Sequence, residues 1–451
     1  MKVIKFGGSS LASATQLKKV LDIVKSDDKR KFVVVSAPGK RSTDDEKVTD
    51  MLIQYAEAYL ANKEVNKYQE KIINRYADMV QELHLDSSVL TKISDSIKKL
   101  CHLDKTHPHR VLDTFKASGE DNNAKLVAAY FSSNGLPATY VNPKQAGLLV
   151  SDEPGCANVL DEAYEQLSNL HHIEGTLVIP GFFGYTKKGD ICTFSRGGSD
   201  ITGSIIAAGV HAELYENFTD VDAIYAAHPG IIDEPKKIDV LTFREMRELS
   251  YAGFGVFHDE ALIPAFKANI PVVIKNTNNP SAPGTNIVAS RATNPHESVI
   301  GIAGDAGFSS IYISKYLMNR EVGFGRHVLA IFESLNLNYE HMPSGIDDIS
   351  IVLRESQITS ELEQILLERL KKELCLDEVK VRHGLSMIVV VGEGMKSRVG
   401  IAAKGTCALA KAGINLEMIN QGSSEVSIIF GIKKEDEIDA IKALYHAYFN
   451  E

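Results

Sequence analysis

Short apolar runs alternate with longer amphipathic segments along roughly the first 275 residues of the chain. Six of the runs have the length and composition of β-strands. They are Val3–Phe6, Phe32–Ser36, Ala138–Val141, Thr176–Pro180, Glu213–Phe218 and Pro271–Lys275. Between the runs, apolar side chains recur at helical spacing, as at Val48, Met51, Leu52, Tyr55 and Tyr59. This alternation predicts a three-layer α/β/α fold, in which helices cover both faces of a mostly parallel sheet.

The alternation stops at Asn276, where a segment rich in Asn, Pro, Ser and Thr runs to Glu297. Turn-forming residues of this kind favour a linker over another strand or helix. We therefore predict a domain boundary near residue 297.

The remaining segment contains an internal repeat. Residues 337–353 align without a gap on residues 414–430, a shift of 77 positions (414 minus 337), with five identities. The identical pairs are Asn338/Asn415, Glu340/Glu417, Gly345/Gly422, Ser350/Ser427 and Ile351/Ile428. Helical periodicity precedes and follows each copy, so each copy reads β-α-β-β-α. That order is typical of a ferredoxin-like unit that lacks one strand.

Two apolar runs can supply the missing strands. The first copy is followed by Glu378–His383, whereas the second ends at Glu451, directly after its last helix. Because Ser298–Ile302 is otherwise unassigned, we infer that it completes the second unit. The predicted domains are residues 1–297, a first ferredoxin-like unit at 308–384, and a second one made of 298–307 and 385–451.

Composition and charge narrow the class of protein. The chain has 451 residues, of which 44% are apolar and 24% are charged, values typical of a globular protein. Its formal net charge of −10 argues against wrapping nucleic acid. We expect no membrane span, because no apolar run approaches the required length of about 18 residues. Five scattered cysteines and an N-terminus without a signal-peptide core favour a cytoplasmic location.

A Gly-rich turn, Lys5-Phe6-Gly7-Gly8-Ser9-Ser10, ends the first predicted strand and is predicted to open a helix. The glycines permit close approach of the backbone, and a helix N-terminus with a neighbouring Lys suits a phosphate. The alternative is a plain turn beside a surface Lys. The chain contains neither the Gly-x4-Gly-Lys-Ser/Thr nor the Gly-x-Gly-x-x-Gly pattern, which disfavours the common nucleotide-binding loops.

A second Gly-rich turn, Ser195-Arg196-Gly197-Gly198-Ser199-Asp200, leads into another predicted helix. Arg196 can hold a carboxylate while Asp200 orients a Lys. The alternative is a capped helix, with Ser199 or Asp200 as its N-cap.

Two further segments can carry a ligand or have only a structural role. Glu120 precedes a predicted helix at Asn123–Phe131, where it can bind an ammonium group or only complement the helix dipole. The segment Phe218–Tyr225 follows a strand and can line a nucleotide or form a polar turn.

These motifs, in this order and spacing, resemble the signatures of the aspartate kinase family, and Asn420–Glu425 resembles a signature of its regulatory ACT domains. The resemblance covers essentially the whole chain. It implies an amino-acid kinase fold followed by two ACT domains, one of them inserted in the other. It also implies phosphoryl transfer from ATP with Mg²⁺ to the β-carboxylate of L-aspartate, the first step of lysine, threonine and methionine synthesis.

The resemblance also implies roles for individual residues. Lys5 would neutralise the transferred phosphoryl group, and Asp200 would orient Lys5. The substrate-binding residues would be Ser36, Thr49, Glu120 and Arg196. The ATP-binding residues would be Lys5, Gly7, Gly8, Ser9, Thr219, Asp220 and Tyr225. We predict no metal site held by protein side chains alone.

The resemblance further implies an effector site in the first ACT domain and a homodimer or homotetramer built through these domains. The residues of the effector site would be Met318, Gly323, Phe324, Gly325, Asn338, Tyr339 and Glu340. We expect lysine as the effector, with threonine second. The alternative is that Asn338 and Glu340 are structural, as their counterparts Asn415 and Glu417 suggest.

Two positions depart from the family pattern. Gly255 stands where many relatives have a Lys, and Gly230 stands where many have an Arg, so two expected ATP contacts are missing. Lys275 is a possible substitute cation. A rival hypothesis is an amino-acid-sensing regulatory protein with an inactive kinase domain. The complete set of Lys5, Glu120, Arg196 and Asp200 favours the enzyme.

Overall fold

The computed structural model describes residues 1–195, 197–255, 260–292, 298–422, 424 and 426–450. It divides into two compact units. The first consists of Met1–Ile224, Lys237–Arg247 and Gly255–Arg291, and the second of Tyr225–Lys236, Glu248–Phe254 and Ala292–Glu451.

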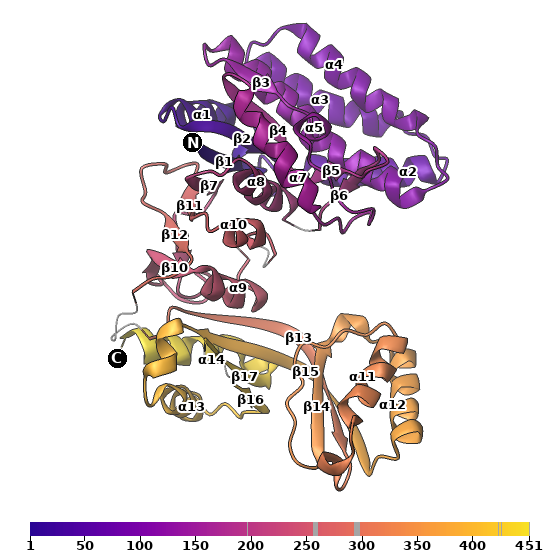
Figure 1. Cartoon of the computed structure of the whole chain (residues 1–451), viewed down its shortest axis with the longest axis vertical. Coiled ribbons are helices and arrows are strands. Elements are labelled where there is room, and N and C mark those ends of the chain that lie inside the picture. The colour runs from indigo at the N-terminus through magenta and orange to yellow at the C-terminus, as the bar shows by residue number, and fades with distance from the viewer. Residues whose placement is uncertain (196, 256–259, 293–297, 423, 425, 451) are drawn as a thin grey trace. The chain divides into compact units, whose positions relative to one another are not determined.

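The first unit is built on an eight-stranded sheet (Figure 1). In spatial order its strands are β10 (Val240–Thr242), β12 (Thr285–Val288), β11 (Val272–Asn276), β7 (Leu214–Thr219), β1 (Lys2–Phe6), β2 (Arg30–Val35), β4 (Thr176–Pro180) and β3 (Ala138–Tyr140). Neighbouring strands are parallel except for β11 and β12 in this described sheet. The predicted mostly parallel sheet is therefore confirmed.

Alternate residues of the central strand face two helical layers, since successive side chains of a strand point to opposite faces. Ile4 and Phe6 belong to an apolar core shared with four long helices and with α1. These helices are α1 (Ala14–Lys25), α2 (Val48–Leu60), α3 (Asn66–Glu82), α4 (Ser87–Lys99) and α5 (Pro108–Ser133). Lys5 faces the other layer, where α8 (Gly198–Gly209) packs on β1 and on α7 (Asp161–Ser168) and α10 (Ile263–Lys267).

Shorter elements connect these layers. They are η1 (Ser9–Leu11), η2 (Leu100–His102), α6 (Pro143–Ala146), η3 (Asn169–His172), the hairpin of β5 (Phe183–Tyr185) and β6 (Ile191–Thr193), β8 (Ile224–Tyr225), β9 (Lys237–Ile238) and α9 (Phe243–Tyr251).

The second unit contains a five-stranded antiparallel sheet in the order β14-β13-β15-β17-β16 (Figure 1). Its strands are β13 (Gly301–Ser314), β14 (Asp348–Arg354), β15 (Glu378–Val391), β16 (Met418–Asn420) and β17 (Ser427–Lys433). Its helices are η4 (Met318–Arg320), α11 (Phe324–Ser334), η5 (Glu355–Gln357), α12 (Ser360–Leu374), η6 (Glu393–Ser397), α13 (Ile401–Lys411), η7 (Lys434–Asp436), α14 (Glu437–Tyr445) and η8 (His446–Asn450).

The strand exchange between the two repeats is present in this sheet. The first half of β13 pairs with the second half of β15, from Gly301 opposite Val391, and that half of β15 also pairs with β17. The second half of β13 pairs with β14 and with the first half of β15. The strand predicted at Ser298–Ile302 is confirmed from Gly301 onward, whereas the domain boundaries remain a prediction.

One predicted strand is wrong. The first repeat was expected to have a strand at the start of residues 337–353, as the second repeat has in β16. In the first repeat this segment forms only isolated bridges, such as His341 with Val352. The repeats therefore differ at residues 341–343, which align with β16, whereas Asn338 and Asn415 both lie outside any strand.

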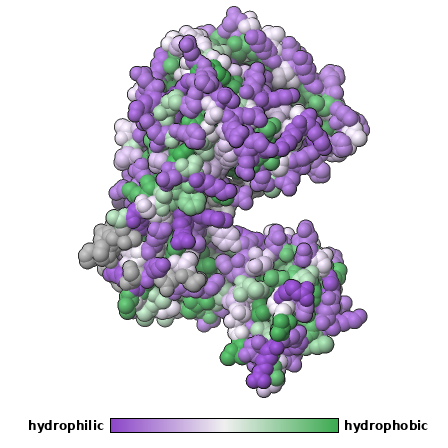
Figure 2. Space-filling view, viewed as in Figure 1, coloured by the Kyte–Doolittle hydropathy of each residue, from purple (hydrophilic) through white to green (hydrophobic). Residues whose placement is uncertain are grey.

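The face of the first unit visible in Figure 2 is mostly hydrophilic, with apolar residues scattered among charged ones. Scattered exposed apolar residues of this kind are ordinary on a protein surface. Within the part of the chain that the structure describes, no helix combines the length and the apolar character needed to cross a membrane.

We predict that Gly392→Ala destabilises the second unit. A Cβ atom on Gly392 would lie 2.1 Å from the carbonyl oxygen of Ser298, so the start of the exchanged strand would have to move. Overpacking of this kind costs about 1–3 kcal/mol, which calorimetry should register as a lower melting temperature.

Gly325→Ala is the matched control, because it lies in α11 and a Cβ there would meet nothing within 4 Å. It should be neutral, or stabilising by up to about 1 kcal/mol. Equal melting temperatures for the two variants would contradict the close contact of Gly392 with Ser298.

Candidate active site

Lys5 is a buried cation at the carboxyl end of β1, with 6% of its surface exposed. Its Nζ lies 2.6 Å from Oδ1 of Asp200, and both side chains are largely shielded from water. A buried ammonium group requires such a partner, because desolvation without one is costly. The predicted pairing of Lys5 with Asp200 is therefore present in the structure.

Asp200 occupies the first turn of α8 and does not cap it. The N-cap is Gly197, in the left-handed region with φ of 75°, and no side chain that the structure describes caps the helix. The alternative in which Ser199 or Asp200 serves as N-cap is therefore wrong. Close packing explains the small residues nearby, since a Cβ on Gly198 would lie 2.4 Å from the Phe182 ring. The Asp200 carboxylate is thus free to face Lys5.

Two residues of β7 support Asp200 and were missed by the sequence analysis. The amide Nδ2 of Asn217 donates to Asp200 Oδ1 at 2.5 Å and to the Tyr215 hydroxyl at 3.1 Å. That hydroxyl donates to the backbone carbonyl of Asp200 at 3.2 Å. Burial, with the nearby Asp200 charge second, raises the pKa of Tyr215 well above its usual value, so it remains a donor. The detectable signal is weak, because β7 contains Glu216 and Thr219 as well as Asn217 and so is not a purely apolar strand.

The turn after β1 does not open an α-helix directly, which corrects the prediction. Ser9–Leu11 form a short 3₁₀ turn, and α1 begins only at Ala14 with Ser13 as its N-cap. A Cβ on Gly7 would lie 3.6 Å from Lys5 Nζ. The Gly7–Gly8 backbone therefore runs directly beside the buried cation.

The turn after β2 crosses the turn after β1. The backbone N–H of Gly39 donates to the carbonyl of Gly8 at 2.8 Å. A Cβ on Gly39 would lie 2.6 Å from the Gly8 carbonyl carbon, so only glycine fits this crossing. Ser36, at the end of β2, is joined to β1 by its N–H, which donates to the Phe6 carbonyl at 3.3 Å.

Glu120 lies inside α5 and not before a helix, as the sequence analysis had expected. Its interpretation as a dipole-complementing residue is therefore wrong. It is 5% exposed, and its Oε2 has no hydrogen-bond partner among the residues that the structure describes. Burial raises the pKa of Glu120 to about 8, although the backbone N–H groups of Ala37 and of Glu120 itself oppose the shift. A buried acceptor without a partner is suited to a charged donor from a ligand.

The predicted substrate residues Ser36 and Thr49 come from elements next to Glu120. The carbonyl of Ser36 accepts a hydrogen bond from Asn123 Nδ2 at 2.6 Å, one turn along α5. Thr49 is the second residue of α2, and its neighbour Val48 faces Gly119, where a Cβ would lie 3.7 Å away. The described structure therefore brings together the end of β2, the start of α2 and the middle of α5. Arg196 lies outside the described residues.

The predicted nucleotide residues are less tightly grouped. Thr219 ends β7, next to Asn276 of β11, and its hydroxyl donates to Asp220 Oδ1 at 3.1 Å. Tyr225 belongs to the second unit. Lys275 pairs in register with Phe218, so it lies on the face of the sheet opposite to Lys5.

The predicted effector residues lie around the start of α11 and before β14. Gly323 is in the left-handed region with φ of 82°, and Phe324 and Met318 are buried. Tyr339 is 47% exposed, and both backbone groups of Asn338 bond to the Gln357 side chain. Glu340 lies 3.7 Å from Arg354. The remaining predicted residue, Gly325, has open space where a Cβ would be.

Together, the residues around Lys5 can bind anions beside a cation-binding carboxylate. The charge of Lys5 lies beside a glycine backbone, and Glu120 offers an open carboxylate oxygen. Within the described residues, no group of three or more His, Cys, Asp or Glu side chains could hold a metal ion. The arrangement can hold a phosphate and an amino acid.

Comparisons with known proteins find matches along the whole chain. Residues 1–276 match the model of the amino acid kinase family, and residues 388–448 match an ACT domain model. The chain is 58% identical to Aspartokinase 3 of Bacillus subtilis over 449 residues, which cover 100% of this chain and 99% of that protein. A crystal structure of Clostridium acetobutylicum aspartate kinase matches with a TM-score of 0.86 and 38% identity, over 99% of this chain and 100% of that one.

Two crystal structures of Escherichia coli aspartokinase III are also similar, each at 25% identity. The complex with aspartate and ADP, described as the R-state, has a TM-score of 0.77 and covers 100% of both chains. The complex with lysine and aspartate, described as the T-state, has a TM-score of 0.73 and covers 100% of this chain and 99% of that one.

We predict that Glu120→Gln stabilises the ligand-free protein at neutral and alkaline pH. The ordinary pKa of a Glu is 4.5 and that of Glu120 is about 8, so between these values the folded chain keeps a proton that the unfolded chain has released. Stability is therefore lost as the pH rises through this window. Gln carries no titrating proton, so the variant avoids the loss.

The measurement is the melting temperature between about pH 5 and pH 8. The excess stability of Glu120→Gln over the wild type should grow with pH, whereas Glu57→Gln, at an exposed position of α2, should follow the wild type. A difference that stays constant with pH would contradict the raised pKa.

Proposed function

Because the chain belongs to the amino acid kinase family, within which it is an aspartate kinase, we propose that Lys5, Asp200 and Glu120 form the core of its active site. The enzyme transfers the γ-phosphoryl group of ATP to the β-carboxylate of L-aspartate, giving 4-phospho-L-aspartate. The observation that carries the site assignment is the 2.6 Å pair of Lys5 with Asp200, beside the Gly7–Gly8 backbone.

The chemistry needs a cation more than it needs a base. A carboxylate oxygen of aspartate forms the new bond to the γ-phosphorus, and the bond from that phosphorus to the β–γ bridging oxygen breaks. ADP leaves with the electron pair of the broken bond. Because the attacking carboxylate is already ionised, catalysis consists mainly of positioning and charge neutralisation. Lys5 supplies the positive charge, and Asp200 with Asn217 fixes its direction.

For the aspartate site, we assign the substrate ammonium group to Glu120. Its open Oε2 supports this, since an ammonium would replace the proton that burial otherwise keeps on the carboxyl group. Arg196 would hold a substrate carboxylate in the two-pronged geometry that guanidinium groups favour. Ser36 and Thr49 would complete the pocket, in line with their positions beside α5.

For the nucleotide, we assign the phosphates to Gly7, Gly8 and Ser9, and the remainder of ATP to Thr219, Asp220 and Tyr225. The complex of the E. coli relative with ADP supports a nucleotide site in this fold. Mg²⁺ would be held largely by the ATP phosphates, as is usual where a protein offers few ligands. Lys275 is not a substitute for a cation on the Lys5 face, since it points to the other face of the sheet.

For regulation, we assign lysine to the turn before α11 and the segment Asn338–Glu340. The lysine complex of the E. coli relative, described as a T-state, supports this choice over threonine. The N-terminus of α11, with its backbone N–H groups and positive dipole end, suits an effector carboxylate. Glu340 would bind an ammonium group, in competition with Arg354 at 3.7 Å. Lysine would then inhibit by binding the inactive state more tightly than the active one.

We further propose a catalytic domain at 1–297, ACT domains at 308–384 and at 298–307 with 385–451, and a homodimer or homotetramer formed through the ACT domains. The continuous sheet of β13 and β15 supports the exchange of strands between the two ACT domains. A cytoplasmic location fits the free cysteines at positions 101, 156, 192, 375 and 407.

Lys5→Met should reduce turnover on the order of 100- to 1000-fold, because one preorganised charge is lost at the transition state. An aspartate- and ATP-dependent hydroxamate assay measures it. Lys2→Met is the matched control, since Lys2 lies in the same strand but pairs with Asp27 at 2.7 Å. Wild-type turnover in Lys5→Met would remove Lys5 from the mechanism.

Glu340→Ala should weaken inhibition by lysine while leaving uninhibited turnover unchanged. Arg354 would keep its 2.6 Å pair with Asp305, so the variant should remain folded. The experiment is a lysine titration at fixed aspartate, with the equivalent repeat position, Glu417→Ala, as control. Identical titrations of Glu340→Ala and wild type would reject this effector site, and a wild type indifferent to lysine would reject lysine itself.

A further inference from the structure

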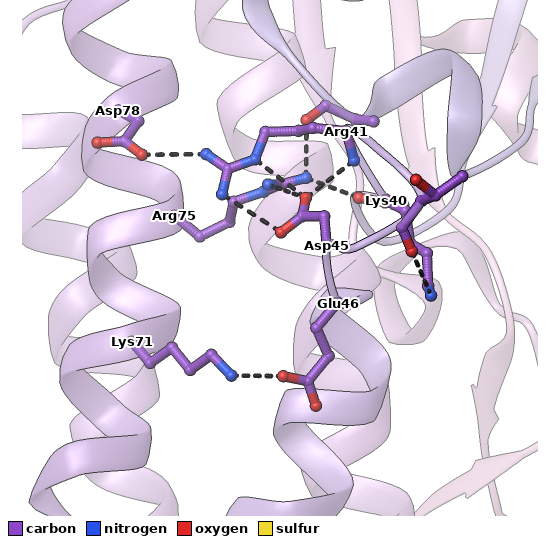
Figure 3. Close-up of polar contacts among 10 residues, drawn as sticks. Lys40, Arg41, Asp45, Glu46, Lys71, Arg75 and Asp78 are labelled. Atoms are coloured by element: carbon purple, nitrogen blue, oxygen red, sulfur yellow. Dashed lines mark hydrogen bonds and ion pairs between the residues drawn. The ribbon is translucent and has the colours of Figure 1, made fainter.

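Arg75 is a buried cation of α3 that joins three separate parts of the first unit (Figure 3). Only 2% of its surface is exposed. Its Nη2 donates to the carbonyl of Ala12 at 2.9 Å and to the carbonyl of Gly39 at 2.6 Å. Its Nη1 donates to Asp45 Oδ2 at 2.6 Å. One guanidinium group therefore links two backbone turns and a loop carboxylate.

Each of these partners follows or precedes a proposed active-site segment. Ala12 directly follows the 3₁₀ turn Ser9–Leu11, which continues the Gly7–Gly8 backbone. Gly39 lies three residues after Ser36, and Asp45 lies in the loop that leads to Thr49 of α2. Arg75 thus bonds to the turn after β1 that is assigned to ATP (residues 7–12) and to the turn after β2 that is assigned to aspartate (residues 36–39).

The two turns are also in direct contact at Gly8 and Gly39. Their 2.8 Å backbone hydrogen bond and the absence of space for a Cβ on Gly39 mean that neither turn can shift alone. Arg75 binds both of these turns, one through the carbonyl of Ala12 and the other through the carbonyl of Gly39. Its position therefore fixes the separation of the two turns.

The other charges around Arg75 hold the same loop more loosely. Arg41 bonds to Asp45 at 3.0 Å and to Asp78 at 3.2 Å, and Lys71 pairs with Glu46 (Figure 3). Arg41 and Lys71 are about half exposed, and exposed pairs contribute little, typically about 0–1 kcal/mol. The buried guanidinium is accordingly the main anchor of the loop.

Burial of Arg75 carries a cost, because its Nε is buried and has no acceptor within the described part of the chain. The three remaining bonds offset it only in this one geometry, in which the planar guanidinium meets two carbonyls and a carboxylate together. A Lys has no comparable fork of donors.

We propose that Arg75 is a positioning residue for phosphoryl transfer, which fixes the distance between bound ATP and bound aspartate through the crossing of Gly8 and Gly39. This role rests on the proposed assignment of the two turns to the two substrates. Each turn can still bind its own substrate without Arg75. The loss should therefore fall on turnover, which depends on the alignment of both substrates.

The competing role is simple stabilisation of the fold, and Arg30 provides a matched control. Arg30 is also a largely buried arginine of the first unit, with bonds to Glu216 at 2.6 Å and 3.0 Å and contacts to Ile23 and Ser26. It begins β2, at the end of the strand opposite to Ser36. Its removal should destabilise the unit without moving the crossing.

The experiment compares Arg75→Gln, Arg75→Lys, Asp45→Asn, Arg30→Gln and Lys5→Met as full-length proteins. For each, the melting temperature, kcat and the KM values for aspartate and ATP are measured well below the melting temperature. Arg75→Gln should lower kcat on the order of 100-fold, as expected for misaligned reactants, while both KM values change by less than about threefold. Arg75→Lys should fall between Arg75→Gln and the wild type.

Arg30→Gln should lower the melting temperature as Arg75→Gln does but keep wild-type kcat. If Arg75→Gln fails to fold, Asp45→Asn and Arg75→Lys decide, since both should lower kcat with little change in KM. Wild-type kcat in these variants, or equal kcat losses in the Arg30 and Arg75 variants, would overturn the proposal. Lys5→Met distinguishes a failure of the Arg75 proposal from a failure of the proposed active site. If Lys5→Met retained turnover, the assignment of the active site would be rejected instead.

Discussion

The site depends on a single electrostatic constraint, which is that the ammonium group of Lys5 is buried near the carboxyl end of the central strand β1. A charge in that position requires an opposite charge, and Asp200 supplies it from α8 at 2.6 Å. The residues around this pair hold it in place or give it room. Asn217 holds the carboxylate, small residues at the start of α8 let the helix approach, and the absence of a side chain on Gly7 leaves space beside the cation. The enzyme therefore has a fixed positive charge before either anionic substrate binds.

Much of the architecture is encoded in patterns that a reader of the sequence can detect. Alternating apolar runs and helical periodicities predicted a mostly parallel sheet, because strands buried on both faces leave continuous apolar runs. The exchange of a strand between the repeats was predicted by counting strands, because the second repeat supplies only three of the four strands that its unit needs. Ser298–Ile302 was the unassigned candidate, and β13 indeed pairs with β15 from Gly301. Lys5 and Asp200 were predicted together because their motifs resemble one family.

Other features depended on tertiary contacts that no local pattern reports. The run Ser118–Asn123 has low helix propensity, so Glu120 was expected before a helix, yet α5 continues through it. Packing explains the difference, because a Cβ on Gly119 would lie 3.0 Å from Ala37 and 3.1 Å from Leu52. Arg75 could not be recognised either, since its partners lie 63 and 36 residues away in the chain, at Ala12 and Gly39.

The most direct test of the account is a double-mutant cycle on turnover between Lys5 and Asp200. The wild type, Lys5→Met, Asp200→Asn and the double variant are compared by kcat under saturating ATP and aspartate. If Asp200 acts by holding and orienting Lys5, removing both should cost no more than removing Lys5 alone, because residues that act as a unit are strongly non-additive. Losses that multiply in the double variant would contradict the account, since they would mean that the two side chains act independently.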